Sequence, residues 1–160
     1  MAIRTIELGT VLVKNGTAGD PNRIKELVGD LRHWLDAELA VRRWPHIEGW
    51  LQGQITKKLV LVNFGKYQPN NHEAWWAVKM EGFLSEGFPE LMAVSPKMAE
   101  FWDKGISSIG ALDDPSAVWL ADDGRPFSTY LSCSPDGRGL HAHSIDNGWD
   151  WDAWFLVSHE

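Results

Sequence analysis

The residues whose spacing most resembles a metal site are His141 and His143. They stand two positions apart in a segment that predicts a β-strand, so both imidazoles leave the same face and could share one ion. A catalytic zinc site would need a third ligand, which His159 or Asp152 could supply in a suitable strand register. The alternative interpretation places both histidines on a solvated sheet face. A metal-dependent enzyme with its site on this strand is therefore one hypothesis among several.

Other candidate groups have ordinary explanations. Asp146, Asp150 and Asp152 would form at most a weak Ca²⁺ or Mg²⁺ site, because the glycine position and the later glutamate of an EF-hand are missing. Cys133 is the only cysteine, and we expect a small buried thiol rather than a nucleophile. No phosphate-binding loop, dinucleotide fingerprint or Gly-x-Ser-x-Gly turn is present in the sequence. We therefore expect no cofactor.

The charge balance is acidic, with 22 Asp and Glu against 15 Lys and Arg, a net charge of −7. Direct nucleic-acid binding is not expected, because it needs a basic face to release counterions. Membrane insertion is not expected either, since the longest uninterrupted apolar run is residues 59–62. The single cysteine is typical of a reducing compartment, so the predicted location is the cytoplasm of a bacterial or virus-infected cell. An acidic protein of this kind suits a basic protein partner.

The composition is most unusual in tryptophan, of which the 160 residues contain 10. Average usage is on the order of one in a hundred residues. Most of these rings should fill the core, but some should reach the surface, where Trp marks binding sites more than other residues do. The ten positions are Trp34, Trp44, Trp50, Trp75, Trp76, Trp102, Trp119, Trp149, Trp151 and Trp154.

The last predicted strand gives the candidate binding residues. Alternation places Trp149 and Trp151 on a core face, with Asp150, Asp152 and Trp154 on the opposite face. A large ring beside two carboxylates resembles the rim of a recognition surface. The predicted partner-binding residues are therefore Trp154, Asp150, Asp152 and Trp119. A carbohydrate platform made of Trp149, Trp151 or Trp154 is an alternative.

Hydrophobic periodicity and turn residues predict the elements that would position these side chains. Residues 4–13 predict strand structure with a bulge or bend at Gly9, and residues 54–64 predict a central strand. The clearest helix covers residues 20–43, opened by Asp20-Pro21 and carrying an apolar stripe of period 3.6. Two shorter helices are expected at about 71–86 and 96–104.

The C-terminal region predicts a four-stranded antiparallel meander. Three Asp-Gly or Asn-Gly turn signals separate its strands, which are expected at residues 117–121, 126–133, 139–145 and 149–158. The predicted fold class is thus α+β, a single domain over residues 1–160. Its mostly antiparallel sheet would include this meander, with the long helix packed on one face.

The sequence as a whole favours a non-catalytic protein that binds another protein. Bacterial immunity proteins, phage-encoded inhibitors and phage virion components are examples of this size and style. The partner is expected to be a protein, basic by charge complementarity, and a homo-oligomer is a second way to cover exposed tryptophan. The metal-dependent enzyme and the carbohydrate-binding module are the alternatives.

Overall fold

A computed structural model describes residues 3–15, 53–112, 119–120, 125–135 and 139–160 of the chain. The described part has an α+β fold built on one mixed, mostly antiparallel sheet. The helix predicted at 20–43 lies outside the described residues. The elements in chain order are β1 (Arg4–Asn15), β2 (Gly53–Asn63), α3 (Asn71–Met80), β3 (Phe83–Ser85), α4 (Phe88–Val94), η2 (Ser95–Lys97), α5 (Met98–Asp103), β4 (Ser108–Ala111), β5 (Trp119–Leu120), β6 (Pro126–Ser132), β7 (Gly139–Ser144) and β8 (Trp154–His159).

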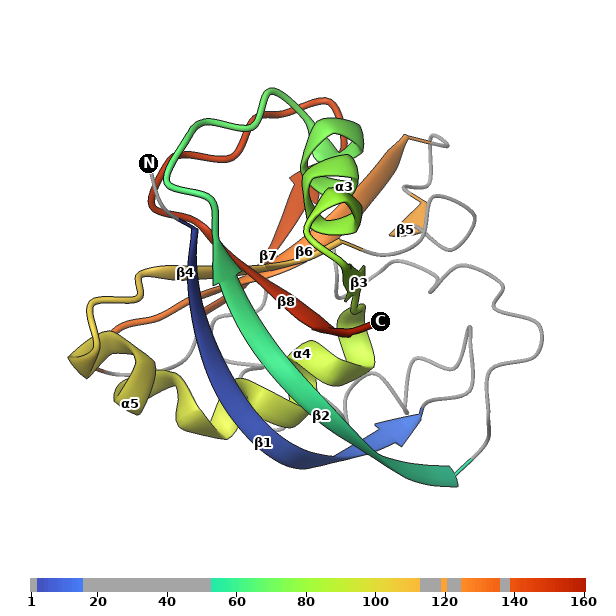
Figure 1. Cartoon of the computed structure of the whole chain (residues 1–160), viewed down its shortest axis with the longest axis vertical. Helices are drawn as coiled ribbons and strands as arrows, with labels where there is room; N and C mark the ends of the chain where they lie inside the picture. Colours follow the sequence, from blue (N-terminus) through green and yellow to red (C-terminus); the bar gives the residue numbers. More distant parts are fainter. Residues whose placement is uncertain (1–2, 16–52, 113–118, 121–124, 136–138) are drawn as a thin grey trace.

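The strand order is β1-β2-β8-β4-β6-β5, with β3 also pairing with β8 and β7 also pairing with β6. All of these pairs are antiparallel except β4 with β8. The long β1–β2 pair curves strongly, as Figure 1 shows in blue and green. Its register shifts between Glu7 and Gly9, and Gly9 has a φ of 75°, so the predicted bulge is confirmed.

The predicted meander is wrong. Strands β5, β6 and β7 do pair in sequence, but β8 leaves them and pairs with β2, β3 and β4. The short strand β4, which the sequence did not indicate, lies between β6 and β8. The segment before β8 is irregular as far as Ala153, so Asn147-Gly148 is not a tight hairpin between two strands.

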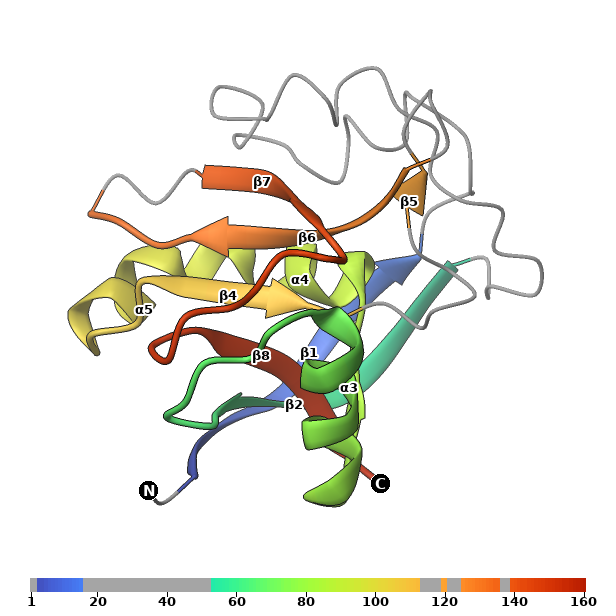
Figure 2. The same cartoon turned by 90° about the horizontal axis from the view of Figure 1, so that it is seen from above.

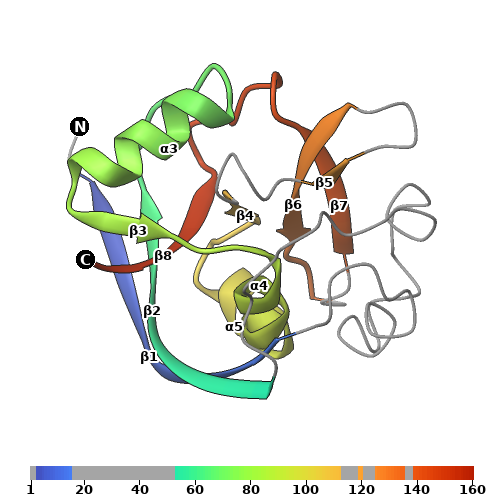
Figure 3. The same ribbon diagram turned by 90° about the vertical axis from the view of Figure 1, so that its right-hand side faces the viewer.

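Helices cover both faces of the central strands. Along β2, Leu59 and Leu61 enter a core with α4 and α5, whereas Val60 and Val62 enter a second core with α3. Figures 2 and 3 show α4 and α5 within the curve of the β1–β2 pair and α3 apart from them. All four side chains have no exposed surface, as expected for a central strand with an uninterrupted apolar run.

The helices begin and end for local reasons. The Asn70 side chain caps α3 by accepting a hydrogen bond from the Glu73 N–H at 2.8 Å. This helix ends at Met80, earlier than predicted, because the chain turns at Gly82 with a φ of 79°. The helix predicted at about 96–104 is present as η2 and α5. It is preceded by α4, which was not predicted and which Pro89 opens in its first turn.

Candidate functional site

The structure reverses the predicted burial of two tryptophans near the C-terminus. Trp154 is only 5% exposed and packs in the α4–α5 core, with the Arg4 guanidinium 5.2 Å above its ring. Trp151, predicted to be buried, is 62% exposed. The reason is that β8 begins at Trp154, so the alternation does not extend back to Trp151, and helices cover both faces of β8.

The remaining predicted binding residues have different surroundings. Asp150 and Asp152 are exposed, on either side of Trp151. Trp119 belongs to β5, and its side chain lies outside the described part. Trp149 is buried like Trp154, so the three predicted carbohydrate-stacking rings do not form one exposed platform.

The histidine pair lies on one face of β7, as predicted, but each ring has its own partner. The His141 Nε2 is 2.8 Å from the Ser132 Oγ, and its ring stacks on Tyr130. The His143 ring stacks on Trp149 with centroids 3.8 Å apart, and burial lowers its pKa.

A third metal ligand from β8 is not in reach of this pair. Strand β7 pairs with β6, whereas β8 pairs with β2, β3 and β4, so His159 does not lie on a neighbouring strand of β7. The His159 Nε2 is instead 2.8 Å from the Glu7 Oε1. In the described segments, no three His, Cys, Asp or Glu side chains gather as a metal site would require.

The prediction for Cys133 is confirmed. Its side chain is 4% exposed within the α4–α5 core, and burial raises the pKa of the thiol to about 12. A thiol with this pKa is protonated at neutral pH, so it lacks the thiolate that a nucleophile needs.

One groove on the surface combines apolar walls with polar groups. It lies beside α3 and has a volume of about 490 Å³. We call it the α3 groove. Residues from the chain start, from the loop between β2 and α3, and from α3 itself line it: Ile3, Phe64, Gly65, Lys66, Gln68, Glu73, Trp76, Ala77, Met80 and Glu81.

The lining of the α3 groove includes Gln68, whose buried amide nitrogen has no partner among the described residues. Gln68 is 4% exposed, and its Nε2 has no hydrogen-bond acceptor within reach among the described residues. A buried donor left in this state costs about 1–3 kcal/mol of stability, so such groups are uncommon unless something else binds them.

The backbone of Gln68 is held firmly in place. Its N–H donates to the Trp149 carbonyl at 2.9 Å, and its carbonyl accepts from the Trp149 N–H at 2.7 Å. Trp149 is fixed in turn, because its Nε1 donates to the Asn71 Oδ1 at 2.8 Å and its ring packs on Gly110. Figure 1 shows the two loops running side by side at the top of the molecule. The backbone of Gln68 is thus held in place before any ligand binds.

Large exposed apolar side chains lie in the groove lining and on the two loops next to it. Trp76 and Met80 line it and are 49% and 77% exposed. Tyr67 belongs to the same loop as the lining residue Gln68. Trp151 is tied to this region through its carbonyl, which accepts a hydrogen bond from the Asn63 side chain, one position before the lining residue Phe64. We call these four residues, Tyr67, Trp76, Met80 and Trp151, the aromatic rim.

The sequence analysis missed this groove, although one signal was present. Trp75 and Trp76 are adjacent on a helix, where neighbouring side chains point about 100° apart, so a single helix face cannot bury both. Their rings meet edge to face, and the Trp76 Nε1 donates to the His72 Nε2 at 3.1 Å. The loop residues gave no comparable signal, because their proximity depends on the Gln68–Trp149 bridge.

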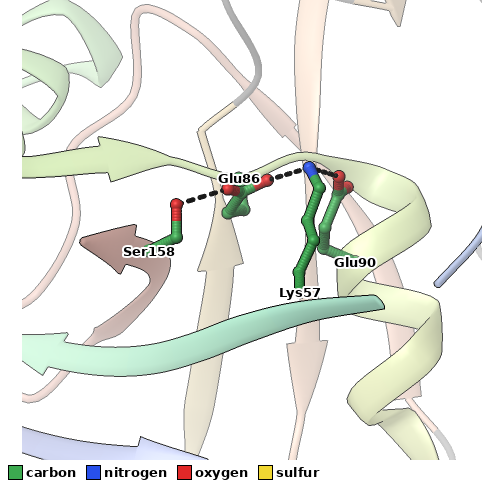
Figure 4. A network of polar contacts seen from close by, with 4 residues as sticks. All are labelled: Lys57, Glu86, Glu90 and Ser158. Carbon is green, nitrogen blue, oxygen red and sulfur yellow. Dashed lines mark hydrogen bonds and ion pairs between the residues drawn. The ribbon is translucent and has the colours of Figure 1, made fainter. Parts of the chain in front are cut away.

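A second polar cluster lies elsewhere, between β2, β8 and α4. The Lys57 Nζ lies 2.9 Å from the Glu86 Oε2 and 2.8 Å from the Glu90 Oε1, and the Ser158 Oγ donates to the Glu86 Oε1 at 2.6 Å (Figure 4). We call this the Lys57 cluster. It joins three elements of the fold at one point.

The Lys57 cluster has one cation for two buried carboxyl groups. Burial raises the pKa of Glu86, and the nearby charge of Glu90 raises it further. Burial alone would lower the pKa of Lys57, but its hydrogen bonds and attraction to Glu90 and Glu86 outweigh this effect and leave it raised. The cluster therefore stays protonated to higher pH than its separate groups would.

Comparison with protein-family models, with curated proteins and with solved structures gave no match for this chain. None of the helices that the structure describes has both the length and the apolar character needed to cross a membrane.

Proposed function

We propose that this protein acts by binding another protein, and that the aromatic rim around the α3 groove makes the contact. The observation that carries the proposal is that the exposed Trp76 and Met80 line a groove, with the exposed Tyr67 and Trp151 on the two paired loops beside it. The same lining includes Gln68, whose buried Nε2 has no partner among the described residues. Trp, Tyr and Met are enriched in protein interfaces, and Trp and Tyr supply much of the binding energy there.

Charge supports a basic partner. The chain has a net charge of −7, and Glu73 and Glu81 line the groove against the single cation Lys66. Asp150 and Asp152 flank Trp151 and add two exposed carboxylates to the rim. Complementary charge of this kind speeds encounter with a positive partner and excludes negative ones. The classes of protein that we propose are bacterial immunity proteins, phage-encoded inhibitors and phage virion components. The proposed location is the cytoplasm of a bacterial or virus-infected cell.

The test is capture of a partner from the source cell with matched variants. A double variant, Trp76→Ser with Trp151→Ser, removes two rings of the rim. The control Trp102→Ser removes an exposed ring from α5, outside the rim. We expect wild type and control to retain the same defined partner and the double variant to lose it, with unchanged circular dichroism. Equal retention by all three proteins would refute the proposed surface, and absence of any partner would refute the function.

A further inference from the structure

Gln68, in the lining of the α3 groove, is the candidate binding group. Its Nε2 carries two N–H donors, and the paired backbone hydrogen bonds to Trp149 hold the residue in place. A ligand that offers an acceptor to these donors gains a hydrogen bond and removes the cost of leaving them unpaired. The acceptor common to every protein segment is the backbone carbonyl oxygen.

The walls of the groove suit an apolar side chain. Ile3, Phe64 and Ala77 provide apolar surface beside the exposed Trp76 and Met80. The volume of about 490 Å³ falls within the usual range of ligand pockets, which is roughly 300–1,000 Å³. A side chain together with its adjoining main chain fits a space of this size. A sugar fits this groove less well, because its hydroxyl groups would face the apolar walls.

The charge around the groove selects the residues beside that side chain. Glu73 and Glu81 outnumber Lys66 along the lining, and Asp150 and Asp152 lie exposed on the adjoining loop. Basic residues flanking the inserted side chain would meet these carboxylates, whereas acidic ones would be repelled.

We infer that the α3 groove binds a basic segment of the partner protein, which inserts one apolar side chain. A backbone carbonyl of this segment accepts a hydrogen bond from the Gln68 Nε2 once the Gln68 side chain rotates toward the groove. This inference rests on the proposed function and specifies the chemistry of the partner. The binding is helix-and-loop recognition of a short linear segment, with Trp76 and Met80 closing over the inserted side chain.

The probe is a library of short synthetic peptides in which a central Leu, Met or Phe is flanked by Lys or Arg. Matched peptides carry a central Ser or flanking Glu. The full chain is labelled with 5-fluorotryptophan, and fluorine NMR follows each ring, with Trp76→Phe and Trp102→Phe assigning two resonances. We expect basic apolar peptides to shift the Trp76 resonance and leave that of Trp102 unchanged. The matched peptides should have no effect.

Two variants test the Gln68 amide and the apolar wall of the groove separately. Gln68→Met keeps the shape of the side chain but removes its donors, and Met80→Ser changes an exposed residue that is not needed for folding. Each should weaken binding of the best peptide by about tenfold. Unchanged affinity in both variants would overturn the inference, as would absence of any Trp76 shift at ~1 mM peptide.

The outcomes separate this inference from the proposed function. If the cellular partner depends on Trp76 and Trp151 but no library peptide binds, the proposed function stands and the groove inference fails. If the partner is insensitive to both rings, both fail. A Trp76 shift caused by a panel of simple sugars, without one from peptides, would replace the protein segment by a carbohydrate.

Discussion

The Lys57 cluster and the α3 groove differ in how their buried polar side chains are paired. In the first, the Lys57 Nζ lies between two carboxyl groups, and the Ser158 hydroxyl donates to one of them. In the second, the Gln68 Nε2 is buried without a partner beside a rim of exposed apolar side chains. The ion pairs of the Lys57 cluster join three elements and stabilise the fold, although the Glu90 Oε2 is buried without a partner among the described residues. The Gln68 Nε2 forms no such pair, so a ligand is the candidate for satisfying it.

Two tryptophans extend this contrast to apolar groups. Trp154 and Trp151 are three positions apart, yet they are 5% and 62% exposed. The first packs in the core beneath α4 and α5, and the second belongs to the rim. If the two regions differ in role as proposed, substitutions in the first should cost stability and substitutions in the second should cost binding.

Trp154→Ala should show the largest effect, a loss of about 3–5 kcal/mol in the free energy of unfolding, because it empties a large volume in the core. Trp151→Ala should change stability by less than about 0.5 kcal/mol, since the ring is mostly exposed. Urea unfolding followed by circular dichroism measures both. Similar losses in the two variants would erase the distinction between core and rim.

Lys57→Met should cost about 3 kcal/mol, since it leaves two buried carboxyl groups without their cation. The control is Lys58→Met, one position along β2, where the side chain is exposed on the other face of the strand. That change should be close to neutral. Equal effects from the two substitutions, again by urea unfolding, would show that the Lys57 cluster contributes nothing beyond surface charge.

Part of this architecture follows from local sequence. The bulge at Gly9 and the buried run along β2 each depend on a few neighbouring residues, and each was predicted correctly. The α+β class and the mostly antiparallel sheet follow from the same signals.

The meander failed because strand order depends on distant contacts. Strand β4 is only Ser108–Ala111, and its Gly110 and Ala111 carry no strand signal. Strand β4 pairs with both β6 and β8, and β8 pairs with β2 on its other edge. In this central position β8 has a core on each face, and Trp154 is buried in one of them. The α3 groove could not be predicted for a similar reason. Its lining residues are distant in the sequence, from Ile3 to Glu81, and only the folded chain brings them together.

Glu86→Gln should change how stability depends on pH, with a smaller effect than removing Lys57. The pKa of Glu86 is raised in the folded state, mainly by burial, so the folded protein holds this proton more tightly than the unfolded chain. Wild-type stability from this group is therefore present below about pH 4.5 and is lost as the pH rises through the folded pKa.

The neutral amide does not titrate, so the variant should gain stability relative to wild type between pH 5 and pH 8. Urea unfolding at several pH values measures this difference. A variant that loses stability relative to wild type across the same interval would mean that Glu86 is held as a carboxylate by Lys57.

Gln68→Met should also stabilise the fold, with a gain of about 1 kcal/mol, because it removes a buried donor that no described group accepts. The matched comparison is Asn63→Leu. That amide is also buried, but it donates to the Trp151 and Ala153 carbonyls and accepts from Arg4. Its removal should cost about 2 kcal/mol. The stability changes at two buried amides five positions apart in the chain would then differ in sign. The difference would show that the Gln68 donors are retained at the expense of stability, as expected for a binding group. A loss of stability in Gln68→Met would instead place the amide among the groups that hold the fold, and the contrast between the two regions would disappear.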